Sequence, residues 1–154
     1  KMYMLPFSIP RLYLCKFLIL TMTLFIAITM QNLSLMKIGI TNLPKGSFEL
    51  KTLLAFAIYS FLTSMPVLSL MLLISSRFEN IWIPLGIGVA GFLSGMAFGT
   101  SKIRIFLANP FIIMLKPAVS MSTQPDFLII IIAVIETFLF LSIGLWTAKN
   151  ICHE

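Results

Sequence analysis

The chain alternates between long apolar runs and isolated charged residues, and the spacing of the charges is typical of membrane-crossing helices. Four runs of about twenty residues or more are long enough to cross a hydrocarbon core of about 30 Å at 1.5 Å per residue. In lipid, the backbone must satisfy its hydrogen bonds internally, so each run predicts a helix. We therefore expect spans at 17–36, 52–76, 80–101 and 127–148.

A fifth apolar run, residues 105–115, is too short to cross a membrane. It is interrupted by Asn109-Pro110 and followed by Pro117, and proline disfavours a continuous helix through the residue before it. We expect a re-entrant or interfacial pair of short helices over about 105–119, with Pro117 as its end. The predicted fold is all-α: a polytopic transmembrane helical bundle of four spans plus this re-entrant stretch, in a single transmembrane domain.

The third run places Gly91, Gly95 and Gly99 four residues apart, so that all three lie on one helical face. In a membrane, such a face lets a neighbouring backbone approach closely, and we interpret it as a packing surface without a substrate role. We expect the other helices to be organised around this one. In the second run, Pro66 removes one backbone donor and predicts a kink.

Composition supports the membrane class and narrows the chemistry. With 59% hydrophobic and 10% charged residues, the chain has too little polar surface for a soluble domain. The eleven Lys and Arg residues are dispersed between apolar runs, which is typical of membrane flanks and not of a nucleic-acid surface. One histidine and two unpaired cysteines, Cys15 and Cys152, leave no ligand set for a metal, and no cofactor motif is present. Because the chain begins at Lys1 and soon enters a span, we expect an N-terminally truncated fragment.

Glu136 is the one Asp, Glu, Lys, Arg or His residue inside the four windows, near the middle of the last. Carboxylates at such depth are functional candidates by default, so Glu136 is expected either to bind a cationic substrate or a proton, or to be a protonated carboxyl bonded to a neighbour such as Ser94 or Thr63. No catalytic residues are predicted, because His153 lies in the tail after the last span without partners.

The layout of the chain resembles that of type-2 ABC exporter permeases. Residues 8–16, SIPRLYLCK, are similar to the S-x-x-R-x-x-x-x-K segment that enters the third helix of that family. Residues 76–80, SRFEN, resemble the short basic turn between its fourth and fifth helices. The glycine-rich helix and the short proline-containing helices before the last span are also similar, and the bacteriocin or lantibiotic immunity branch is the nearest in character.

The resemblance implies that residues 17–148 are the last four of six helices in the permease subunit of an ATP-driven exporter. Its substrate would be an antimicrobial peptide or a lipid-like molecule. The subunit itself would be no enzyme, since a separate ABC ATPase subunit would hydrolyse ATP, and a second permease chain would complete a homo- or heterodimer. The expected location is a bacterial cell membrane, with both chain ends and the turn at 75–80 in the cytosol. Charge alone leaves the orientation open, with five cations on one side and six on the other.

Fixed charges beside helix ends can pair with a partner, so Arg11, Lys16, Arg77 and Glu79 are candidates for the ATPase interface. The alternative is that the cations are ordinary anchors at the membrane surface. Two other functions remain open at this point: a non-transporting membrane scaffold or immunity protein, and an intramembrane lipid-modifying enzyme. The enzyme would need several polar residues at one depth, where the sequence offers only Glu136.

Overall fold

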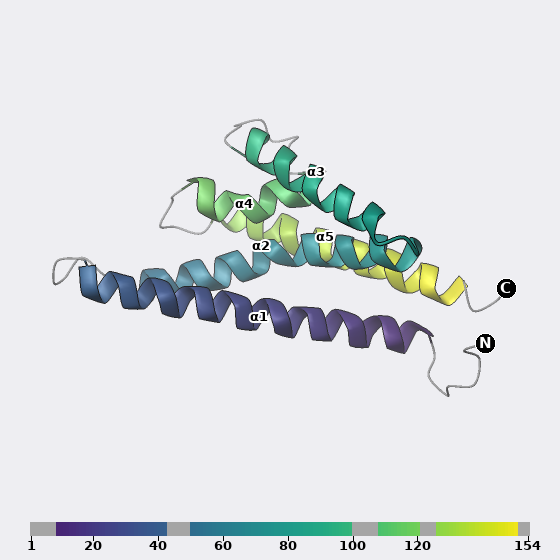
Figure 1. The fold of residues 1–154 in the computed structure, drawn as a ribbon, viewed down its shortest axis with the longest axis horizontal. Coiled ribbons are helices and arrows are strands. Elements are labelled where there is room, and N and C mark those ends of the chain that lie inside the picture. The colour runs from purple at the N-terminus through teal and green to yellow at the C-terminus, as the bar shows by residue number, and fades with distance from the viewer. Residues whose placement is uncertain (1–8, 43–49, 100–107, 121–125, 151–154) are drawn as a thin grey trace.

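The computed structural model describes residues 9–42, 50–99, 108–120 and 126–150. The described part of the chain is all-helical and has no strand (Figure 1), which confirms the expected helical class. In chain order the helices are α1 (Ile9–Asn42), α2 (Leu50–Arg77), α3 (Trp82–Phe98), α4 (Pro110–Ser120) and α5 (Phe127–Asn150). Of these, α1, α2 and α5 are long and apolar enough to cross a membrane, whereas α3 and α4 are shorter apolar helices.

The central helix is α2, which contacts each of the other four. Near its C-terminal end, Leu72 packs with Tyr13 from the start of α1 and Ala148 from the end of α5. In its first half, Tyr59 packs with Ala133 of α5 and Ile113 of α4. From one contact between α2 and α5 to the next, the residue numbers of both helices increase, so these two helices are parallel. α1 runs antiparallel to both (Figure 1). The expectation that the glycine helix is the organising element is therefore wrong.

Small side chains explain why α2 can hold the central position. Thr63, Pro66 and Ser69 recur every third residue and are fully buried, so neighbouring helices come close on that side. The hydroxyl groups of Thr63 and Ser69 do not need partners from other helices. Thr63 Oγ1 donates to the carbonyl of Tyr59 at 2.9 Å, and Ser69 Oγ donates to the carbonyl of Pro66 at 2.9 Å. α2 continues as one helix through Pro66.

The short helix α4 lies along α3 and runs in the same direction. Three neighbouring pairs relate the two helices: Gly91 with Phe111, Gly95 with Leu115, and Gly99 with Val119. Both numbers rise by four from one pair to the next, as expected for parallel helices in register. Ile112 and Ile113 are fully buried, because α4 also contacts α2 and α5.

Several boundaries differ from those expected. α1 extends beyond 17–36 at both ends and includes Lys16 and Lys37, whose long side chains can reach the membrane surface from inside a helix end. α3 is shorter than 80–101. In the fifth run, Pro117 does not end the helix, which continues to Ser120. Proline is compatible with helical φ and loses one backbone bond, and here its ring is buried in the bundle. Residues 105–107, the start of the predicted stretch, lie outside the described residues.

Large apolar side chains are exposed on the outer faces of the helices. Examples are Leu18 of α1, Leu54 of α2, Leu93 of α3 and Phe138 of α5, each more than half exposed. Soluble monomers rarely carry so extensive an apolar surface, and in a membrane it is the surface that meets lipid. The described helices thus have the surface of a membrane protein.

Candidate functional site

The glycine face of α3 is filled by α4. A Cβ placed on Gly91 would lie 2.5 Å from Cζ of the Phe111 ring, and one placed on Gly95 would lie 2.9 Å from Cδ1 of Leu115 and 3.0 Å from the Phe111 carbonyl oxygen. No larger residue fits at 91 without displacing the ring. We call Gly91 and Gly95 against Phe111 and Leu115 the glycine contact. Because the two glycines have no side chains, α4 packs directly against the backbone of α3 there.

Asn109 fixes the start of α4 beside the middle of α3. Its Oδ1 accepts a hydrogen bond from the backbone N–H of Phe111 at 3.1 Å, and its carbonyl accepts one from Ile112 at 3.0 Å. Its Nδ2 donates to Ser94 Oγ on α3 at 3.4 Å. Asparagine at the N-cap followed by proline at the first helical position is a start signal. α4 thus begins at Asn109-Pro110, where the break between the two short helices was expected.

Glu136 lies on α5 with one carboxylate oxygen, Oε2, buried and without a hydrogen-bond partner among the described residues. Neither of the two neighbours proposed for it bonds to this oxygen, and each donates its hydroxyl hydrogen within its own helix. Thr63 Oγ1 donates to the Tyr59 carbonyl at 2.9 Å, and Ser94 Oγ donates to the Gly91 carbonyl at 2.7 Å. The interpretation of Glu136 as a carboxyl bonded to Thr63 or Ser94 is therefore not supported by the geometry.

Other buried polar atoms without partners lie on the inward stripe of α1. This stripe recurs every three or four residues, and its polar members include Tyr13, Thr21 and Asn32. Within the described ranges, the Tyr13 hydroxyl, Thr21 Oγ1 and Asn32 Oδ1 have no hydrogen-bond partner. Buried polar groups are normally paired, so the unpaired ones with room beside them are candidate positions for a bound water or ligand.

Thr21 and Glu136 lie at the same depth in the bundle. Tyr13 of α1 contacts Gly144 of α5, and the two helices are antiparallel. Thr21 is eight residues after Tyr13 and Glu136 is eight residues before Gly144, so each lies about 12 Å from that contact along its helix. A hydroxyl and a carboxylate, both with a free buried oxygen, thus share one level of the α1 and α5 pair.

The four candidate interface residues are exposed and gather at one end of the bundle. Because Tyr13 packs against Leu72, the first turns of α1, with Arg11 and Lys16, adjoin the last turn of α2, with Arg77. Glu79 follows in the turn between α2 and α3. At the opposite end are the cations Lys37, Lys51 and Lys116. The structure thus brings together charges that are more than sixty residues apart in the sequence.

A close contact between Tyr13 of α1 and Gly144 of α5 was not predicted from the sequence. A Cβ on Gly144 would lie 2.9 Å from Cε1 of Tyr13, and closer still to its hydroxyl oxygen, so the tyrosine lies against the bare backbone of α5. The sequence did contain one sign of this contact, the single glycine Gly144 among the bulky residues of the segment LSIGLW. A lone small residue in a membrane helix lets a neighbouring helix approach its backbone closely.

Neither metal chemistry nor similarity assigns a function to this arrangement. Among the residues that the structure describes, no three His, Cys, Asp or Glu side chains lie together as a metal site would require. No known protein family, no curated protein and no solved structure matches this chain. Function must therefore be inferred from the helix arrangement, the polar level at Thr21 and Glu136, and the charged end.

Proposed function

We propose that this chain is the membrane-spanning permease subunit of an ATP-driven exporter of the type-2 ABC kind that its sequence resembles. The observation that carries the proposal is the position of α4. This short helix precedes the last long helix, begins beside Ser94 in the middle of α3, and runs along α3 to the level of Gly99. A short helical stretch before the last span is what the resemblance implies.

The directions of the helices support a fourth crossing by α3. Because α2 and α5 are parallel, the chain between them must return across the bundle an odd number of times. α3 has 17 residues, about 26 Å, and its flanking residues Ile81 and Gly99 also have helical dihedrals. With these flanks α3 nearly matches a hydrocarbon core of about 30 Å.

The same directions support a re-entrant role for α4. Gly99 and Val119 are neighbours at one end of α3, whereas Asn109 lies beside Ser94, deeper in the bundle. The chain therefore leaves α3, reaches the middle of the bundle at Asn109, and returns to the side that it left. Irregular backbone at such depth is tolerated when it is covered by protein, as the burial of Phe111 and Ile112 provides.

The charged end is the proposed docking surface for the ATPase. Arg11, Lys16, Arg77 and Glu79 lie at the ends of helices that run through the bundle, so a force applied there is transmitted along rigid helices. The orientation implied by the resemblance puts this end in the cytosol, where ATP is available. The chain has no nucleotide-binding motif of its own, and ATP hydrolysis is assigned to the partner.

The polar level at Thr21 and Glu136 is the proposed substrate contact. A carboxylate oxygen without a protein partner can accept a hydrogen bond from an ammonium or guanidinium group, and the apolar surroundings strengthen that attraction. The exposed apolar surface beside it suits the rest of an amphipathic molecule. A cationic amphipathic peptide fits both features, and in the permease dimer this level would face the second chain.

A co-purification experiment tests the proposal. The full-length protein, isolated in a gentle detergent from its native membrane, should carry an ATPase subunit with it. Arg77→Glu should lower the recovery of that subunit and the ATP-dependent export while leaving the membrane level unchanged. Lys51→Glu, a matched reversal of an exposed lysine at the opposite end, should change neither. Absence of any ATPase from the isolated protein contradicts the exporter proposal and favours the non-transporting scaffold.

A further inference from the structure

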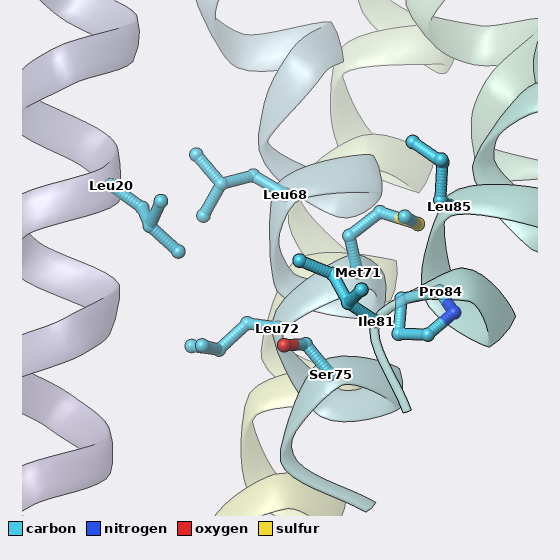
Figure 2. A pocket seen from close by; sticks show the side chains of 8 residues that line it. All are labelled: Leu20, Leu68, Met71, Leu72, Ser75, Ile81, Pro84 and Leu85. Carbon is cyan, nitrogen blue, oxygen red and sulfur yellow. The ribbon is translucent and has the colours of Figure 1, made fainter. Parts of the chain in front are cut away.

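An apolar groove lies where α1, α2 and the start of α3 meet. It has a volume of about 370 Å³ and is lined chiefly by Leu20 of α1, by Leu68, Leu72 and Ser75 of α2, and by Ile81 and Leu85 near the start of α3. In Figure 2, Leu20 and Leu68 point toward one another from their two helices, while Ser75 lies at the end of α2 nearest its C-terminus. Its volume is within the range of small-molecule sites, and its wall is almost wholly hydrocarbon.

We propose that this groove binds one acyl chain of an anionic phospholipid, whose headgroup lies against Lys16 and Arg77. The depth of the groove fits one leaflet. Leu68 lies nine residues before Arg77, about 14 Å along the helix, and half of a hydrocarbon core is about 15 Å. On α2 the groove runs from Leu68 to Ser75, so it lies between about the middle of the membrane and Arg77 at the surface.

The charges at the mouth of the groove select the sign of the headgroup. Lys16 is one turn from Leu20 on the same side of α1, toward the membrane surface, and Arg77 lies two residues beyond Ser75. Both side chains are exposed. At this end the described residues include four cations and one acid: Arg11, Lys16, Arg77 and Lys149 against Glu79. A phosphate-bearing anionic headgroup complements this excess, and each basic residue near the surface favours anionic lipid.

The groove is also continuous with the surface that meets the membrane. Leu18 and Ile19, immediately before Leu20, are 59% and 63% exposed, and Ile81 is 76% exposed. An acyl chain can therefore enter sideways from the bilayer without crossing polar protein. The site does not depend on the proposed transport function, although it shares Lys16 and Arg77 with the proposed docking surface.

Tryptophan quenching by brominated lipids tests this site. Trp82 follows the groove residue Ile81, and Trp146 is the other tryptophan of residues 1–154. Trp146→Phe, with any tryptophan outside these residues also replaced by Phe, leaves Trp82 as the single reporter. The full-length protein is purified without any partner and reconstituted in bilayers containing either phosphatidylglycerol or phosphatidylcholine with brominated acyl chains. We expect phosphatidylglycerol to quench Trp82 at a lower mole fraction. Equal quenching by the two lipids would overturn the proposal.

Charge variants separate a site from general surface attraction. Lys16→Gln or Arg77→Gln should each lower the preference for phosphatidylglycerol about five-fold, equivalent to about 1 kcal/mol for one basic residue. Lys149→Gln removes an exposed cation at the same end, but α5 does not line the groove, so the preference should be kept. If Lys149→Gln has the same effect as Lys16→Gln, the preference is a property of the surface and the proposal is wrong.

A filling variant tests the acyl chain itself. Leu68→Phe adds volume inside the groove and should remove the preferential quenching, whereas Leu18→Phe adds the same ring on the lipid-facing side of α1 and should not. If Leu68→Phe is expressed poorly, the charge variants still decide the question, because they leave the helix interior intact. Since no ATPase is present, failure here would not bear on the proposed export function, nor would failure of the co-purification bear on lipid binding.

Discussion

The ring of Phe111 occupies the volume that any side chain at residue 91 would need. A Cβ there would lie 2.5 Å from the ring Cζ, well inside van der Waals contact. Four residues later, the carbonyl oxygen of Phe111 would be 3.0 Å from a Cβ on Gly95, so backbone and not only side chain blocks that position. The position of α4 along α3 thus depends on two glycines where even the methyl group of alanine would collide with α4.

We expect Gly91→Ala to destabilise the protein by about 1 to 3 kcal/mol, because a large aromatic ring must move to admit the methyl group. The matched control is Gly86→Ala on the same helix, where a Cβ would meet nothing within 4 Å. There alanine should be neutral or stabilising by up to about 1 kcal/mol, from its higher helix propensity. Thermal unfolding of the purified protein measures both variants, and equal stability of the two would contradict the packing described here.

The contact between Tyr13 and Gly144 predicts a coupled pair. Tyr13→Phe removes a buried hydroxyl without a partner, so we expect unchanged or increased stability, by up to about 1 kcal/mol. Gly144→Ala should destabilise by about 1 to 3 kcal/mol, since the tyrosine hydroxyl oxygen and Cζ lie against the added methyl group.

In the double variant, Tyr13→Phe should recover part of the loss caused by Gly144→Ala, because the nearest atom has been removed. The double-mutant cycle then gives a coupling energy of about 0.5 kcal/mol or more. Strictly additive effects would show that α1 does not approach α5 at these residues.

Glu136→Gln keeps the shape of the side chain and deletes its charge. Because Oε2 has no hydrogen-bond partner among the described residues, the substitution breaks no bond that the structure records, and we expect the membrane level and thermal stability to be unchanged. Export of a cationic substrate should fall, since the attraction to the carboxylate is lost. Glu136→Asp, which keeps the charge, should retain part of the activity. Full export by Glu136→Gln would assign the residue a structural role.

Cysteine labelling tests the crossings and their orientation. A membrane-impermeant maleimide applied to intact cells should not reach Cys15, which is free and exposed at the charged end, nor a cysteine replacing Glu79. In a Cys15→Ser background it should label Lys51→Cys and Val119→Cys from outside. Cys152, predicted to share the side of Cys15, lies outside the described residues, so any such experiment also requires Cys152→Ser.

Labelling of Glu79→Cys and Val119→Cys from the same side would mean that α3 does not cross. Labelling of Cys15 from outside, with Lys51→Cys protected, would reverse the orientation and place the charged end outside the cell. The reversed orientation would also remove the cytosolic surface on which the ATPase is proposed to dock.

The sequence by itself determined the helices. In lipid an unpaired backbone group is so unfavourable that a long apolar run must form a helix. Charged residues mark where that helix reaches water. Windows bounded by single charged residues therefore predicted α2 and α5 to within a few residues, and they located α3 and the short helix α4. The candidate residues Glu136 and Arg77 were found in the same way, because a charge is conspicuous in such a chain.

Only the tertiary structure decided which faces of the helices meet. Lipid tails are as apolar as leucine, so burial against another helix and exposure to the membrane leave the same hydropathy in the sequence. That is why the central position of α2, the parallel course of α3 and α4, and the packing of Tyr13 against Gly144 were not predicted. These depend on the shapes of a few small residues, whose partners lie twenty to more than one hundred residues away in the chain.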